Sequence, residues 1–137
     1  MFLPAISHSY LDRAAECLRE AAETTDVPQR YALAHVSALR ATAALLAARA
    51  TPTLSKRRKQ PTAWYLLAKV APEFADWATF FAAGASKRAA AEAGSRRAVT
   101  SREADDLIRD ATCFLHLIED ALGVAHLDSG IRSVRTA

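Results

Sequence analysis

Glycine and proline are scarce in this chain, and their scarcity already limits the fold. The 137 residues include 4 glycines and 5 prolines, which is few for a protein built of many short strands joined by turns. Alanine instead makes up about 23% of the residues, a proportion typical of helical bundles. The composition therefore predicts an all-α fold and argues against a sheet protein.

Cysteine is also rare, and long apolar runs are missing. Cys17 and Cys113 are too far apart in the sequence, and too isolated, for a zinc site or a dense disulfide framework. No run of 18 apolar residues occurs, and the first ten residues include no lysine or arginine, so neither a membrane span nor a signal peptide is indicated. We expect reduced thiols, no membrane association and a cytoplasmic location.

The common catalytic motifs are absent as well. The sequence contains no G-x-S-x-G, no G-x-x-x-x-G-K-[ST] and no G-x-G-x-x-G, which disfavours hydrolase-type nucleophiles and nucleotide hydrolysis by the common folds. Five acids near the end of the chain are expected to point outward, unlike the inward Glu-x-x-His pairs of metal-binding bundles. They are Asp105, Asp106, Asp110, Glu119 and Asp120. We therefore predict no metal and no cofactor.

The first half of the chain predicts two helices. A first helix is capped by Ser7 or Ser9 and runs to about Thr25, with an apolar stripe at helical spacing. A second helix starts at Asp26 and runs to about Ala50. Because apolar residues occupy most of its circumference, this second helix is predicted to be the central one.

The middle of the chain predicts a loop and two further helices. Residues 51–62 contain two prolines and a run of basic residues, so they are predicted to form a loop. Thr62 caps a short helix, and the Ala71-Pro72 step ends it because a residue before proline avoids the α-helical conformation. A fourth helix runs from Pro72 to about Gly94.

The last predicted helix has the clearest pattern. Thr100 or Ser101 caps it, Glu103 stands at capping-box distance from Thr100, and Gly123 ends it. Its apolar face covers five turns: Ala104, Leu107, Ile108, Ala111, Phe114, Leu115, Ile118 and Leu122. We expect one helical domain over residues 1–123 and a C-terminal tail over residues 124–137.

Four aromatic residues and one histidine are predicted to belong to the core. Trp64, Trp77, Phe80 and Phe81 have helical spacing, and a groove for a partner or ligand is the alternative interpretation. His35 lies on the apolar second helix, where a hydrogen-bonded core or interface histidine is favoured over a catalytic base.

Charge is distributed unevenly along the sequence. Residues 1–50 are neutral overall, residues 51–99 carry +6 and residues 100–137 carry −3. The most concentrated basic run, Lys56, Arg57, Arg58 and Lys59, is a candidate for sequence-independent phosphate contacts with RNA or another polyanion. Charge matching within the molecule or across a dimer, and a solvated loop, are the alternatives.

A family resemblance is carried by three stretches: RYALAHVSALRATAALLAAR, PTAWYLLAKVAPEFADWATFFAAGASKRAAAEAG and SREADDLIRDATCFLHLIEDALG. Together they resemble the HEPN family (higher eukaryotes and prokaryotes nucleotide-binding), in particular a short stand-alone actinobacterial branch, over about residues 5–123. The resemblance implies an up-and-down bundle of four to five helices. It also implies a homodimer, because many members of the family pair, and a role on or around RNA.

The resemblance also points to two site residues. Ribonucleases of the family use an arginine and a histidine with four to six residues between them, near the last helix, in a composite site across a dimer that needs no metal. Arg30 and His35 have this spacing but lie in the second predicted helix. Arg109 and His116 lie in the last one, and seven positions along a helix place them on one face, nearly opposite the apolar stripe.

The sequence thus favours a non-catalytic helical interaction module, which is nucleic-acid-associated or binds a protein partner. The alternative is a metal-independent endoribonuclease that uses Arg109 and His116 across a dimer. The first is preferred because an Arg-His spacing of this kind is expected by chance in a chain of this composition, and no other motif argues for catalysis.

Overall fold

The structure is a computed structural model that describes residues 3–49 and 62–125. All regular structure in these two ranges is helical, as predicted. The α-helices are α1 (Ala5–Glu23), α2 (Val27–Arg49), α3 (Ala63–Val70), α4 (Ala75–Ala83), α5 (Ala85–Glu92) and α6 (Ser101–Leu122), with a short 3-10 helix, η1 (Pro72–Phe74), between α3 and α4.

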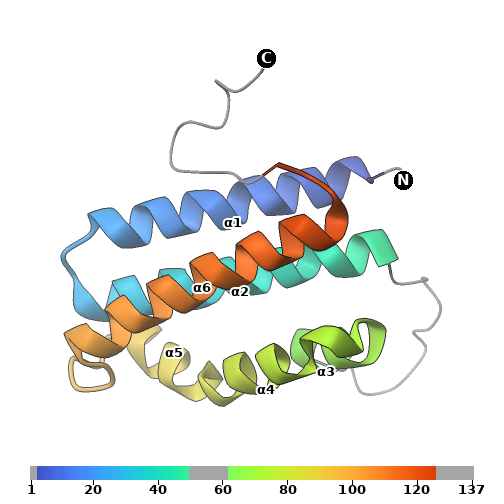
Figure 1. Cartoon of the computed structure of the whole chain (residues 1–137). Helices are drawn as coiled ribbons and strands as arrows, with labels where there is room; N and C mark the ends of the chain where they lie inside the picture. Colours follow the sequence, from blue (N-terminus) through green and yellow to red (C-terminus); the bar gives the residue numbers. More distant parts are fainter. Residues whose placement is uncertain (1–2, 50–61, 126–137) are drawn as a thin grey trace.

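The helices form an up-and-down bundle around one hydrophobic core (Figure 1). Successive segments of the bundle alternate in direction: α1, α2, the run from α3 to α5, and α6 (Figure 1). α2 contacts α1 and α6 as well as α3 and α5. The prediction of a central second helix is therefore confirmed.

α2 is apolar enough to pass a simple test for a membrane span. By length and composition alone the helix could cross a bilayer, since its most apolar window has a mean hydropathy of 1.3. More than half of that window, 56%, is nevertheless buried inside the protein. Its apolar character is explained by its place at the centre of the bundle.

Several helix ends lie where their capping residues predicted them. The Thr62 hydroxyl accepts a hydrogen bond from the Tyr65 amide at the start of α3. At the start of α6, Thr100 and Glu103 form the reciprocal capping box, and Gly123 ends the helix with a φ of 72°. Asp26 lies just before α2 and accepts a hydrogen bond from the amide of Gln29.

The predicted start and end of the first helix were wrong by a few residues. α1 begins at Ala5 after Pro4 and ends at Glu23, so neither serine caps it. The Ser7 side chain is instead buried within the helix and donates a 2.8 Å hydrogen bond to the Ala44 carbonyl of α2. The hydroxyl thus joins two helices rather than ending one.

The predicted fourth helix is broken at Gly84, which separates α4 from α5. A Cβ atom at this position would lie only 2.8 Å from the Tyr31 hydroxyl oxygen. A larger residue here would force the Tyr31 side chain of α2 to shift, so this contact favours glycine. The break lets α5 pack against α2 while α4 continues from α3.

Candidate functional site

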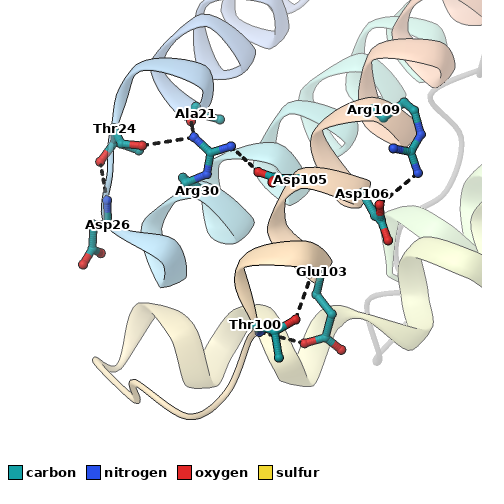
Figure 2. A network of polar contacts seen from close by, with 9 residues as sticks. All are labelled: Ala21, Thr24, Asp26, Arg30, Thr100, Glu103, Asp105, Asp106 and Arg109. Atoms are coloured by element: carbon teal, nitrogen blue, oxygen red, sulfur yellow. Dashed lines mark hydrogen bonds and ion pairs between the residues drawn. The ribbon is translucent and has the colours of Figure 1, made fainter.

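Arg109 lies on the solvent-exposed face of α6 and is already bound to an acid. Its guanidinium donates to a carboxylate oxygen of Asp106, one turn earlier, at 3.0 Å (Figure 2). The arginine side chain is 68% exposed and the aspartate side chain 46%. The pair is thus a surface ion pair within one helix, a type that contributes about 0–1 kcal/mol.

His116 lies two turns after Arg109 on the same helix. It is partly buried, whereas Cys113 between the two is exposed. The side opposite is the buried one, with Leu107 and Ala111 in the core. The expectation that Arg109 and His116 lie on the outer side of α6 agrees with this burial, and their catalytic role stays a prediction.

The other Arg-His pair, Arg30 and His35, has a structural role. Arg30 donates to the carbonyl of Ala21 at 3.0 Å and to that of Thr24 at 3.1 Å, and it forms an ion pair with Asp105 of α6 (Figure 2). Its guanidinium therefore ties the end of α1 and the start of α2 to α6. In this structure Arg30 therefore has a structural role.

His35 is a core histidine, as predicted. The side chain is 1% exposed, and its Nε2 atom lies 2.8 Å from the Phe81 carbonyl oxygen, so this nitrogen carries the donated proton. Burial lowers the pKa of His35, although the hydrogen bond to Phe81 opposes that shift. A neutral, hydrogen-bonded imidazole inside the bundle stabilises the fold and is closed to solvent.

The basic run Lys56, Arg57, Arg58 and Lys59 lies outside the described residues, as do residues 126–137 of the predicted tail. The nucleic-acid-binding role of this run therefore stays a prediction. Among residues 3–49 and 62–125, no group of three or more His, Cys, Asp or Glu side chains is arranged to hold a metal ion.

The outer face of α6 is acidic. The helix contains two arginines against six acids, and four of those acids, Asp105, Asp106, Asp110 and Asp120, are exposed or partly exposed. Glu119 corrects the expectation that all of these acids point outward, because it is fully buried. It follows Leu115 by four residues and precedes Leu122 by three, so it lies on the buried stripe.

A shallow hollow opens between α4 and α6. Its volume is about 290 Å³, and it is lined by Asp76, Trp77 and Phe80 of α4 and by Asp110 of α6. The two rings are nearly perpendicular, with an angle of 88° between their planes and 6.3 Å between their centroids. We refer to these four residues as the α4–α6 hollow.

The aromatic residues predicted to be core divide into two groups. Trp64 and Phe81 are buried, at 7% and 1% exposure, and their rings stack. Trp77 is partly buried, and Phe80 is 46% exposed. The prediction that Phe80 is a core residue was wrong, because the outer side of α4 carries no covering helix among the described residues. The alternative interpretation, a groove for a partner or ligand, stays a prediction.

Both cysteines are free thiols. Burial raises the pKa of Cys17, which is partly covered on α1, whereas Cys113 is exposed on α6. The expectation of two reduced thiols is met in this structure.

Comparison with known protein families identifies a match over most of the chain. A family model described as HEPN-like matches residues 21–119. This stretch begins near the end of α1 and reaches almost to the end of α6, so it includes α2 and both sides of the α4–α6 hollow. No curated protein and no solved structure matches the chain.

Proposed function

The chain belongs to the HEPN family, and we propose that it is a non-catalytic interaction module. It forms a homodimer in this proposal, and it binds a protein partner through the exposed surface of α4 and α6. The observation that carries this proposal is the acidic outer face of α6, on which Arg109 is already paired with Asp106. HEPN domains commonly dimerise.

The charge of α6 supports a protein partner over RNA at this surface. A phosphate approaching Arg109 would meet Asp106, Asp110 and Asp120 on the same helix, and like charges raise the cost of that approach. The arginine would also have to leave Asp106. A basic protein surface meets the opposite situation, since each of these acids attracts it.

An NMR titration with a short single-stranded RNA at about 50 mM salt tests this choice. We expect the amide signals of α6, residues 101–122, to stay unchanged as the RNA is added. Shifts concentrated around Arg109 and His116 would overturn the assignment of α6 to a protein partner.

Pairing is tested by sedimentation velocity at tens of micromolar protein. The chain has a mass of 14.8 kDa, and the proposal expects a species of twice that mass. A monomer throughout this range would overturn the homodimer.

Phosphate contacts are proposed for a different segment, Lys56–Lys59. Replacing all four residues with neutral ones should weaken RNA or DNA binding about equally for every sequence and reduce the salt dependence, because phosphate contacts carry no base information. Binding that is unchanged in this variant, measured by fluorescence anisotropy, would remove the segment from the proposal.

A metal-independent endoribonuclease is the second candidate, favoured by the position of Arg109 and His116 two turns apart on the outer side of α6. Such an enzyme would use the histidine for proton transfer and the arginine for phosphate charge. RNA cleavage in the presence of EDTA by the wild type, lost in His116→Ala and kept in the exposed control His8→Ala, would overturn the non-catalytic proposal. We expect no cleavage by any of the three proteins.

A further inference from the structure

The two carboxylates of the α4–α6 hollow differ from the acids around them. Neighbouring acids are engaged: Asp105 pairs with Arg30, and Asp106 with Arg109. Asp76 and Asp110 form no ion pair within residues 3–49 and 62–125, although they come from different helices and line the same hollow. Two negative groups on one small concave surface attract a cation.

The aromatic walls of the hollow suit a flat cation. Trp77 is held from the core side by Phe81 and Phe114, whose ring centroids lie 5.9 Å and 5.4 Å from its own. Phe80 stands nearly perpendicular to Trp77 and is 46% exposed. A cation can therefore meet the exposed ring of Phe80, and the partly exposed tryptophan beside it is already fixed in place.

We propose that the α4–α6 hollow binds the guanidinium group of an arginine side chain that belongs to a protein partner. A guanidinium is planar, stacks on aromatic rings and donates two parallel hydrogen bonds to a carboxylate, and these are the properties that Trp77, Phe80 and the two aspartates would engage. This inference deepens the proposed function, because it names the chemistry by which the acidic surface of α4 and α6 recognises a partner.

The shape of the hollow favours a side chain of a protein over a free small molecule. Its volume of about 290 Å³ is at the lower end of ligand sites, and four residues line it. An arginine that extends from a polypeptide gains further contacts on the surrounding surface, where Leu117 of α6 is 38% exposed. Arginine is also among the residues that contribute most to binding at protein interfaces.

The test is an NMR titration of the full chain with the peptide acetyl-Gly-Arg-Gly-amide. The chain has two tryptophans, so two indole N–H signals can be followed. We expect the Trp77 signal to shift in a saturable, salt-sensitive way, and the Trp64 signal, which reports a ring that is 7% exposed, to stay in place. The same peptide with citrulline, which has the shape of arginine without its charge, should cause no shift.

Single substitutions separate the contributions of the two aspartates and of Phe80 to peptide binding. Asp76→Asn and Asp110→Asn should each weaken peptide binding about two- to fivefold, the range for partly exposed ion pairs. Phe80→Ala should weaken it to a similar degree by removing a wall of the hollow. Glu16→Gln is the matched control, because it removes the same charge from α1, where Glu16 pairs with Arg19 at the surface, and it should leave binding unchanged.

Three results would overturn the inference. Equal binding of the citrulline peptide would show that charge is not recognised, and equal weakening by Glu16→Gln would show that only the overall charge matters. Free L-arginine that binds more tightly than the peptide would assign the hollow to a small molecule. The RNA and sedimentation experiments do not involve the hollow's ligand, so a failure of the inference and a failure of the proposed function are separate results.

Discussion

Toward α1, helix α2 presents small residues, whereas toward α3, α4 and α5 it presents Tyr31 and His35 to a cluster of rings. On the α1 side the Ser37 hydroxyl donates to the Ala14 carbonyl at 2.8 Å, as Ser7 does to Ala44 in the other direction. Such bonds require two helix backbones to lie close together, which small side chains permit. We refer to this as the small-residue side of α2.

The aromatic side is built in the opposite way. Phe81 lies within 6.0 Å, between ring centroids, of His35, Trp64, Trp77 and Phe114. Large rings fill the space between the helices on the inner side of α4. On its outer side, Phe80 and part of Trp77 are exposed to solvent. The comparison shows that the small-residue side fixes the architecture, while the aromatic side also leaves side chains available to a ligand.

The largest loss of stability is expected from Phe81→Ala on the aromatic side. Removing a ring that is 1% exposed and central to the cluster should lower the free energy of unfolding by about 3–5 kcal/mol. Urea denaturation measures this loss. Phe80→Ala is the control and should cost much less, because Phe80 is 46% exposed. A comparable loss in both variants would contradict the division of the aromatic residues into core and surface.

A second change tests the contact between Gly84 and the Tyr31 side chain of α2. Gly84→Ala places a Cβ atom 2.8 Å from the Tyr31 hydroxyl oxygen and should cost about 1–3 kcal/mol, the range for overpacking. Because the clash involves that oxygen alone at this distance, adding Tyr31→Phe should restore part of the loss. Thermal denaturation of the single and double variants gives the comparison, and a simple sum of the two single losses would speak against the contact.

On the small-residue side, Ser37→Ala should have a smaller effect. It removes one buried hydrogen bond, that to the Ala14 carbonyl, for an expected loss of about 1 kcal/mol. Ser9→Ala, an exposed position on α1, is the matched control with no expected change. If chemical denaturation finds no difference between the two variants, the hydroxyl bridge is not a source of stability.

The smallest effect is the pH dependence of stability that arises from His35 on the aromatic side. Because burial lowers the pKa of His35 below its usual 6.5, the unfolded chain binds a proton there before the folded chain does. The stabilisation is complete above about pH 6.5 and is lost as the pH falls below it, with a slope under about 1.4 kcal/mol per pH unit. Urea denaturation between pH 7 and 5.5 should show this slope in the wild type and a weaker one in His35→Gln.

Local patterns predicted most of the helix ends. The capping box at Thr100 and the stop at Gly123 depend on residues a few positions apart, so the sequence contains all the information. The wrong predictions lie where a contact with a segment distant in the sequence determines the local structure. Ser7 has the pattern of a cap, but α2 passes close enough for its hydroxyl to bond to the Ala44 carbonyl. Gly84 has the pattern of a helix interior, but α4 ends there and α5 packs against α2.

The candidate site was predicted only in part, for the same reason. That Arg109 and His116 share a face follows from helix geometry within α6. The α4–α6 hollow joins Asp76 to Asp110 across two segments, and nothing in the sequence sets that distance. The available signal was the aromatic spacing around Trp77 and Phe80, for which a groove was the alternative interpretation.

The hydrogen bonds of Arg30 bear on the order in which the helices assemble during folding. Two of them reach back six and nine positions to Thr24 and Ala21, so they need only the hairpin of α1 and α2. The third joins a residue 75 positions ahead, Asp105. A guanidinium already oriented by the hairpin loses little further freedom when that long loop closes. We therefore expect the hairpin to form before the last helix docks on it, because its contacts are close in sequence and a low contact order favours rapid folding.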